Sequence, residues 1–254
     1  MALQFATVGS GSKGNACLVK SRESLILVDC GFAVRELGRR LEILDVSLED
    51  ISAVLVTHEH SDHCKGVGAL ARQLKLPVYM TPGTQLGRDF GRIPNMNLIV
   101  GYSQFAVGDI TVSPVAVPHD AREPAQFIFE SGGRKLGVLT DLGSITPHIL
   151  AAYSHCDGLL LEANHDSQLL AQGPYPWSLK QRVAGDWGHL NNSQAVEFLE
   201  MASMPTLSTL VVGHISEKNN CLSVVREAFA STSFQKNIHF AAQGHPSEWF
   251  ELGV

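Results

Sequence analysis

Short apolar runs that end in polar or glycine residues recur along the chain, as expected for β-strands. They cover residues 3–8, 16–20, 25–29, 53–57, 78–80, 97–100, 110–117, 125–130, 135–141, 158–162, 208–212 and 238–242. Elsewhere, apolar residues recur at the spacing of a helix. These predicted helices cover residues 33–45, 65–75, 146–153, 192–203 and 219–230.

The order of these elements bears on the fold class. The first third of the chain is rich in strands with few helices between them, which argues against a doubly wound sheet. Later strands alternate with helices, so helices are expected outside the sheets. We therefore predict an α/β protein with two sheets in a sandwich flanked by helices. No repeat, low-complexity tract or linker interrupts the chain, and we expect a single domain over residues 1–254.

Composition narrows the class of protein. Hydrophobic residues make up 44% of the chain, enough for a sizeable core. No apolar run approaches the ~20 residues of a membrane helix, and the first residues lack a secretion signal. We therefore expect a cytoplasmic protein without a membrane partner. The five cysteines are scattered and form no CxxC pair, which argues against a disulfide framework and a cysteine-rich zinc site.

The net charge of −6 argues against a broad surface for nucleic acid. Two bound divalent ions would offset most of that charge. The global charge therefore neither supports nor excludes a local site for an anionic substrate.

The stretch VLVTHEHSDHCKG contains the most specific chemical signal. An apolar strand leads into four side chains that bind metals, His58, His60, Asp62 and His63. Imidazole and carboxylate groups suit zinc, manganese or iron, and the lack of cysteine ligands argues against a structural zinc. His58 and His60 can face one ion while Asp62 and His63 face a second. The alternative is a polar loop with incidental histidines.

Further ligands are expected where other strands end, because the backbone is held rigidly there. VSPVAVPHD ends near His119, KLGVLTD ends in Asp141 and STLVVGH ends in His214. A carboxylate can bridge two ions about 3.5–4 Å apart. One histidine after a strand is more often structural, but together with the cluster at residues 58–63 these side chains favour a metal site.

This series resembles the metallo-β-lactamase superfamily: Asp29 in LILVDCG, then HxHxDH, then His119, Asp141 and His214. Six motifs further resemble its WalJ/YycJ-like branch of 5′-to-3′ exonucleases. They are GSGSKGN, VTHEHSDH, HDAREP, EANHD, YPWSLKQR and HISEKNN. The resemblance implies an αββα sandwich with a dinuclear metal site at one edge of the two sheets. It also implies DNA as substrate, although related branches include RNase Z and cyclic-phosphate diesterases.

The same resemblance implies a role for each ligand of two divalent ions, zinc or manganese, or iron. The first ion would be held by His58, His60 and His119. The second would be held by Asp62, His63 and His214. Asp141 would bridge the ions. Asp29 would brace the loop at residues 58–63, called the metal loop below, by hydrogen bonds without binding metal.

Two motifs are candidates for contacts with the substrate. GSGSKGN matches GxGxxG but leads into a strand, so neither a Rossmann nor a P-loop interpretation fits its context. Its Ser10, Ser12 and Asn15 can still contact a phosphate, the alternative being a tight turn. In YPWSLKQR, Lys180 and Arg182 can contact phosphates beside aromatic faces for base stacking. The alternative is an amphipathic helix with its aromatic residues packed inward.

Metal-assisted hydrolysis of a phosphodiester fits these residues. Two ions lower the pKa of a bridging water, which gives hydroxide at neutral pH. The leaving oxygen needs a proton from a histidine near the metals but not bound to them. His189 precedes a helix capped by Asn191 or Asn192, which suits a phosphate contact or a proton donor. The alternative is a surface histidine near a helix cap.

Asp62 and His189 are therefore the predicted catalytic residues. Glu162 and His165 in EANHD follow another strand, so both are expected close to the metal site. For His165, support of the ligands and contact with the substrate are both open.

Four functions are compatible with these sequence features. A DNA exonuclease is favoured by the resemblance along the chain. A phosphodiesterase for small cyclic phosphates or nucleotides is the alternative, because it needs no basic groove. A lactone or thioester hydrolase would have no need of Lys180 and Arg182. A non-catalytic protein is disfavoured because all seven expected ligands are present.

Overall fold

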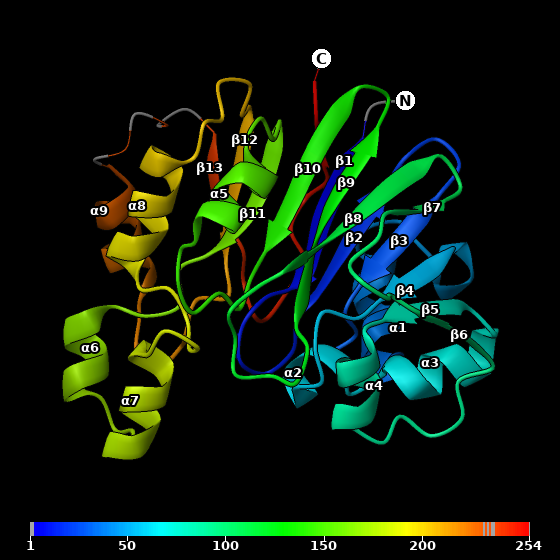
Figure 1. Cartoon of the computed structure of the whole chain (residues 1–254), viewed down its shortest axis with the longest axis horizontal. Helices are drawn as coiled ribbons and strands as arrows, with labels where there is room; N and C mark the ends of the chain where they lie inside the picture. The colour runs from blue at the N-terminus through cyan, green and yellow to red at the C-terminus, as the bar shows by residue number, and fades with distance from the viewer. Residues whose placement is uncertain (1–2, 231, 233, 235–236, 254) are drawn as a thin grey trace.

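The strand-forming runs pair into two mixed sheets that lie face to face (Figure 1). The structure is a computed structural model that describes residues 3–230, 232, 234 and 237–253. Within these residues, the first sheet has the order β14-β1-β2-β3-β4-β5-β6 and the second has the order β13-β12-β11-β10-β9-β8-β7.

The first sheet consists of β1 (Gln4–Gly9), β2 (Ala16–Lys20), β3 (Leu25–Val28), β4 (Ala53–Leu55), β5 (Pro77–Met80), β6 (Asn95–Leu98) and β14 (Phe250–Glu251). The second consists of β7 (Phe105–Val107), β8 (Ile110–Ala116), β9 (Ala125–Ser131), β10 (Arg134–Leu139), β11 (Gly158–Glu162), β12 (Thr209–Gly213) and β13 (Ile238–Phe240). Antiparallel pairs join β7 to β10, and parallel pairs continue to β13. The central parallel strands β11 and β12 are buried along their whole length, which explains their apolar sequences.

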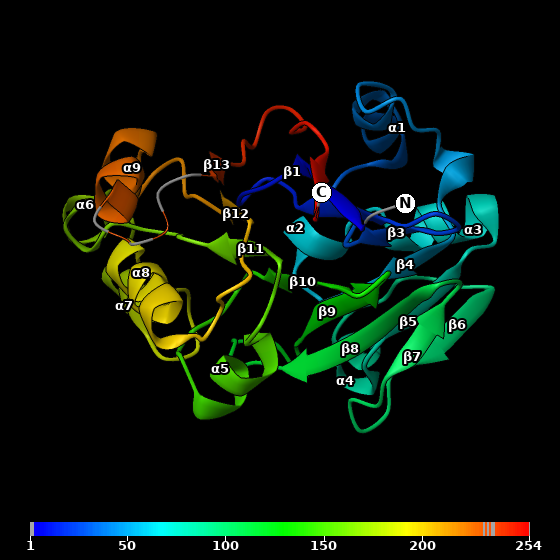
Figure 2. The same ribbon diagram turned by 90° about the horizontal axis from the view of Figure 1, so that it is seen from above.

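Helices cover the outer faces of both sheets (Figure 2). The helices beside the first sheet are α1 (Val34–Glu42), α2 (Ser61–Cys64), α3 (Val67–Leu74) and α4 (Pro82–Gly87). Those beside the second sheet are α5 (Pro147–Tyr153), α8 (Asn192–Met201) and α9 (Leu222–Ala230). Two further helices, α6 (Ser167–Gln172) and α7 (Trp177–Ala184), lie below α8 and α9 in Figure 1. The predicted fold class, two sheets between layers of helices, is confirmed.

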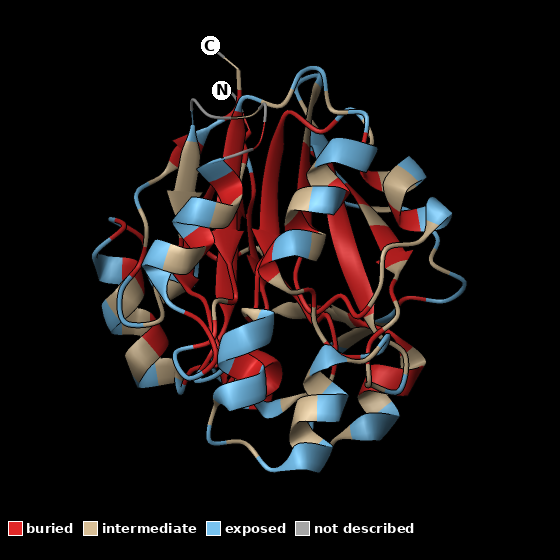
Figure 3. Ribbon diagram, turned by 90° about the vertical axis from the view of Figure 1, so that its left-hand side faces the viewer, coloured by how far each residue is buried: buried red, intermediate tan, exposed pale blue. Residues whose placement is uncertain are grey.

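Apolar side chains form three layers across this sandwich. Phe5, Phe127 and Phe129 lie between the sheets. Leu37 represents the layer under α1, and Phe198 represents the layer under α8. Figure 3 shows the strands as the buried centre and the helices exposed on their outward sides. None of the described helices is long and apolar enough to cross a membrane.

Local signals set where several helices begin. The side chain of Thr146 accepts a hydrogen bond from the backbone N–H of Ile149, and Pro147 follows it at the first helical position. Asn191 caps α8 and shares a reciprocal capping box with Gln194. Of the two asparagines considered for this cap, Asn191 is the one that fills it, so the position of His189 relative to α8 is fixed.

Candidate metal centre

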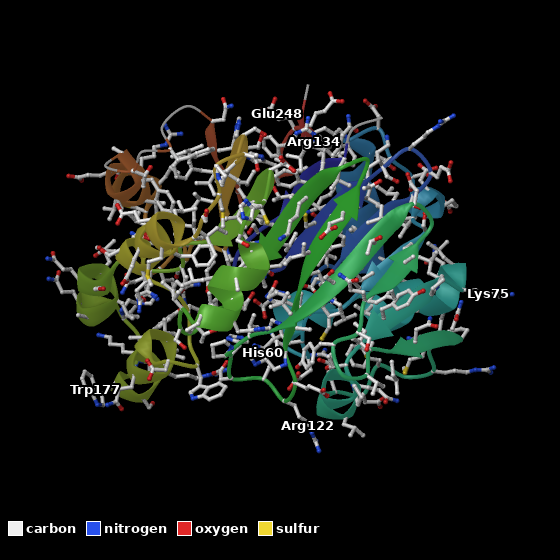
Figure 4. The ribbon with its side chains drawn as sticks, turned by 45° about the horizontal axis from the view of Figure 1, so that its top comes forward. His60, Lys75, Arg122, Arg134, Trp177 and Glu248 are labelled. Atoms are coloured by element: carbon white, nitrogen blue, oxygen red, sulfur yellow. The ribbon has the colours of Figure 1, made fainter. Side chains whose placement is uncertain are left out.

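The chemistry-bearing side chains meet where strands of both sheets end. His58, His60, Asp62 and His63 follow β4 and lie at the start of α2. The other donors come from the second sheet: His119 follows β8, Asp141 follows β10, Glu162 ends β11 and His214 follows β12. Figure 4 shows His60 beyond these strand ends. Residues far apart in sequence are thus held by rigid strands at one edge of the sandwich.

The donor atoms form neighbouring sets with the spacing that a metal ion requires. The donor atoms of His58, His60 and His119 lie within 4.8 Å of one another. The same holds for Asp62, His63 and His214. These are the two sets that the family resemblance implied.

Asp141 lies between the two sets. Its Oδ2 atom is 3.2 Å from Nε2 of His63, and its Oδ1 atom is 3.2 Å from Nδ1 of His214. Oδ1 is also 3.9 Å from Nε2 of His119, which belongs to the first set. A carboxylate in this position can serve both sets.

The unpaired polar atoms of the cluster fit a bound divalent metal. Nε2 of His58 is buried without a hydrogen-bond partner among the described residues. Oδ2 of Asp141 and Nδ1 of His214 lie 3.2 Å from side chains of the cluster, but these contacts lack hydrogen-bond geometry. An unsatisfied buried polar atom costs about 1–3 kcal/mol, and a metal ion supplies the missing partner. Imidazole and carboxylate donors without cysteine are typical of a catalytic site for a divalent metal, whereas structural zinc sites usually contain cysteine ligands.

The electrostatics of the cluster also favour a bound cation. Burial alone would lower the pKa of His63, but Asp141 and Asp29 raise that pKa well above its usual range. Burial also opposes the charge on His214, whereas Asp141 again raises its pKa. The carboxylates therefore favour positive charge at these positions, whether it is carried by protons or by a metal ion.

The backbone around the cluster is held in an unusual conformation. Asp29, Asp141 and His214 have φ angles of 62°, 54° and 50°, in the left-handed region that non-glycine residues rarely adopt. Such strain costs about 1–3 kcal/mol per residue and persists where the surrounding structure enforces it. The hydrogen bonds of Asp29 hold one of these strained residues in place beneath the metal loop.

Asp29 is buried and joins the end of β3 to the metal loop. Its Oδ1 atom accepts a hydrogen bond from the backbone N–H of Thr57 at 2.8 Å. Its Oδ2 atom accepts one from the Thr57 hydroxyl at 2.8 Å and lies 2.8 Å from Nδ1 of His63. Asp29 thereby fixes the His63 ring with Nε2 directed toward Asp141.

Buried Glu162 pairs with half-buried His189 beside the donor sets. Oε1 of Glu162 accepts hydrogen bonds from the backbone N–H groups of Leu142 and Leu190. Its Oε2 atom lies 3.1 Å from Nδ1 of His189. Burial would raise the pKa of Glu162, but His189 beside it lowers that pKa to about 2. The resulting carboxylate holds a proton on Nδ1 of His189, which leaves Nε2 for a reacting group.

The donor sets open into a cavity of about 340 Å³. His60, Asp62 and His189 lie on its metal side, and Leu179 and Arg182 of α7 line the opposite wall. The cavity therefore has metal donors on one side and the side chains of a helix on the other.

Asp120 connects these two walls and was missed by sequence reasoning. It forms an ion pair with Arg182, and its Oδ1 atom lies 3.5 Å from Nε2 of His119. Burial would raise the pKa of Asp120, but the Arg182 guanidinium lowers it. The sequence feature that could have identified Asp120 is its position directly after His119 in HDAREP.

The predicted substrate contacts are distributed unevenly. Ser10 is buried and accepts a hydrogen bond from the backbone N–H of His214 at 2.7 Å. The side-chain amide of Asn15 lies 3.0 Å from Nε2 of His63, beneath the metal loop. Ser12 is exposed at the tip of its loop, and Lys180 donates a hydrogen bond to the carbonyl of Ala171.

Only Arg182 of the five predicted substrate contacts lines the 340 Å³ cavity. Predicted residue His165 lines a different cavity, between α6 and α7.

Comparisons with known proteins agree on one superfamily for this chain. The family model described as a β-lactamase superfamily domain matches residues 25–215. Exodeoxyribonuclease YycJ of Bacillus anthracis is 35% identical over 246 residues, covering 93% of this chain and 91% of that protein. Exodeoxyribonuclease WalJ of Streptococcus pneumoniae is 32% identical over 224 residues, covering 85% and 83%. The structure of Zn²⁺-bound PqqB from Methylobacterium extorquens shares the fold, with a TM-score of 0.75 at 15% identity over 96% of this chain and 99% of that one.

Proposed function

The chain belongs to the β-lactamase superfamily, and on this premise we propose that it is a metal-dependent phosphodiester hydrolase that degrades DNA from the 5′ end. The observation that carries the proposal is the pair of adjacent donor sets next to the Glu162–His189 pair. The likeness to two exodeoxyribonucleases over most of the chain supports DNA as the substrate.

We propose that two divalent ions occupy the donor sets, zinc or manganese, or iron. His58, His60 and His119 would hold one ion, and Asp62, His63 and His214 would hold the other, with Asp141 shared. When bound, such ions lower the pKa of a water between them and neutralise charge on the phosphate.

Asp62 and His189 are the side chains that we propose to act in the reaction. Asp62 lines the cavity, so its carboxylate can orient the attacking water while it also serves as a ligand. His189 lines the same cavity and donates a proton from Nε2 to the leaving oxygen. Glu162 positions the His189 ring for this step, because its Oε2 atom lies 3.1 Å from Nδ1 and accepts a hydrogen bond from it.

The cavity wall formed by α7 fits the end of a nucleic-acid strand. Ligand pockets typically range over about 300–1,000 Å³, and 340 Å³ lies at the lower end. Such a volume suits one terminal nucleotide better than a length of duplex. Tyr175 offers a face for the base, and Arg182 can exchange Asp120 for a phosphate.

A small cyclic phosphodiester is the second candidate substrate, and the small volume of the same cavity supports it. Its single phosphate would need only Arg182 and the metal ions, without a basic groove. That fits the net charge of −6. For either substrate we propose the cytoplasm as the location.

A nuclease assay with defined ends tests the proposal. The metal-loaded protein is incubated with 5′-labelled duplex and single-stranded DNA, and release of labelled mononucleotides is expected. His58→Ala should abolish the release, while the control His148→Ala, an exposed histidine on α5, should not. Hydrolysis of a cyclic nucleotide without cleavage of DNA would favour the second candidate. Failure to cleave any phosphodiester with metal bound would overturn the proposal.

A further inference from the structure

A second cavity lies on the other side of α7. It has a volume of about 230 Å³ and is lined by residues of α6, of α7 and of the segments around His165 and Asn191. We call it the α6–α7 pocket. Neither the metal chemistry nor the proposed positions of the ions uses it.

Helix α7 separates this pocket from the metal centre. Leu179, Arg182 and Val183 recur at helical spacing and line the 340 Å³ cavity at the metal centre. Trp177, Lys180 and Gln181 share the spacing of another face and line the α6–α7 pocket. Because residues three and four apart lie on one side of a helix, α7 presents one functional face to each cavity.

The helix is not explained as part of the hydrophobic core. None of the described residues of α7 is buried, and Trp177 is 73% exposed. Figure 4 shows Trp177 projecting outward from α7. An exposed aromatic residue beside a cavity with mostly apolar walls is typical of a binding site.

The lining of the pocket indicates which ligand chemistry it would accept. Leu170 and Trp177 provide an apolar wall and an aromatic face for a planar ring. The Lys180 amine donates one hydrogen bond, to Ala171, and retains two donors for an anion. His165 is only 1% exposed, and its Nδ1 atom has no hydrogen-bond partner among the described residues.

The buried imidazole adds polarity that packing alone does not require. Burial lowers the pKa of His165 to about 4, so the ring is neutral near pH 7. A neutral imidazole presents one donor and one acceptor. Together the lining offers a stacking face, a cation and a polar ring, which match the base and phosphate of a nucleotide.

We propose that the α6–α7 pocket is a second nucleotide-binding site, with the base against Trp177 and the phosphate at Lys180. The choice of a nucleotide rests on the proposed nuclease function, whereas the cavity does not depend on it. The nucleotide comes either from a bound strand or from a free nucleoside monophosphate. In both cases binding needs no metal ion.

Nuclear magnetic resonance of the chelator-treated protein tests this site without measuring activity. The chain has three tryptophans, so three indole N–H signals are assignable by substitution. Titration with a nucleoside 5′-monophosphate and with a short single-stranded oligonucleotide should shift the Trp177 signal. The signal of Trp187, which is also exposed but lies outside the pocket lining, should stay in place.

Two variants check the assignment. Lys180→Gln should weaken binding about tenfold by removing the cation, and Trp177→Ala should weaken it by at least as much. Both residues lack a core role, so folding should be unaffected, and Trp187→Ala is the matched control. Tighter binding of the oligonucleotide would identify the strand as the source, and tighter binding of the monophosphate would identify the free nucleotide. Absence of a Trp177 shift with both ligands, or an equal shift of Trp187, would overturn the proposal even in a protein that cleaves DNA.

Discussion

Nδ1 of His63 lies 2.8 Å from Oδ2 of Asp29, while Nε2 of the same ring lies 3.2 Å from Oδ2 of Asp141. One histidine therefore connects the end of β3 to the centre of the donor cluster. Asp29→Asn should keep the hydrogen bond from the backbone N–H of Thr57 but place an amide NH₂ group opposite the Thr57 hydroxyl and His63. Supporting residues of this kind typically change metal affinity by about 10–100-fold, and we expect a loss in that range.

Isothermal titration with Zn²⁺ or Mn²⁺ measures this affinity directly. Asp89→Asn is a suitable control, because Asp89 is exposed and its side chain accepts a hydrogen bond within its own turn, from the backbone N–H of Gly91. Equal metal affinity in Asp29→Asn and in the unchanged protein would contradict the role of Asp29 as a support for His63.

Removal of His189 separates catalysis from metal binding. We expect His189→Ala to retain the bound metal and to lose about 10²–10⁴-fold in kcat, the usual contribution of general acid catalysis. Glu162→Gln should lose part of the same factor, because its amide oxygen can still accept from Leu142 and Leu190 while the carboxylate charge is gone. Since the two residues act together, the double variant should be little slower than His189→Ala.

Metal content measured by atomic absorption is the deciding control for His189. Its ring lies in a possible donor set with His119 and Asp141, so it is also able to bind metal. If His189→Ala loses one ion, then His189 is a ligand and another group supplies the proton.

Chelation of the metal should lower the thermal stability of the protein. An ion present at about 100 times its Kd stabilises the folded state by about 2.7 kcal/mol. For a chain of this size that corresponds to about 5–10 °C in Tm for each ion. Differential scanning fluorimetry with and without EDTA measures the shift.

His58→Ala should show a smaller EDTA effect than His148→Ala, because only the first substitution removes a proposed ligand. Imidazole must be neutral to bind metal, so the shift should also shrink as the pH falls toward 5. An unchanged Tm after chelation at neutral pH would contradict coupling between metal binding and the fold.

The donor cluster was predictable from the sequence because it combines two strong patterns. Apolar strands such as β10 and β12 are buried throughout most of their length. Asp141 follows the end of β10 after Thr140, and His214 follows β12 directly. Because these strand ends meet at one edge of the sandwich, the polar residues that follow them lie close together in space. The pairing of His119 with the loop at residues 58–63 came from the family resemblance, because periodicity gives no information on which strands are neighbours.

Other features lacked such a signal. Strands β7 and β14 are too short for a two-residue alternation to stand out. Helix α7 has no buried residue, so it shows no apolar stripe, and its division between two cavities depends on tertiary position. Lys180 and Arg182 are neighbours in sequence but lie in the walls of different cavities, a distinction that follows only from the helix orientation.

Gly31 provides a test of how rigidly the metal loop is supported. A Cβ atom at this position would lie 1.8 Å from the carbonyl oxygen of Asp62 and 2.6 Å from the backbone nitrogen of Asn15. Both contacts are with backbone, so Gly31→Ala must displace the loop, at about 1–3 kcal/mol of stability. The displaced Asp62 and His63 should also bind metal more weakly.

Urea unfolding and metal titration of Gly31→Ala measure the two effects on the same preparation. Gly244→Ala is the matched control, because a Cβ atom there has no neighbour within 4 Å. If the Gly31 variant lost stability without losing metal affinity, this result would contradict the expected link between the position of the metal loop and metal binding. We expect both losses together, since the loop backbone is held by hydrogen bonds from Asn15 to Asp62 and from Cys30 to His63, each 2.7 Å long.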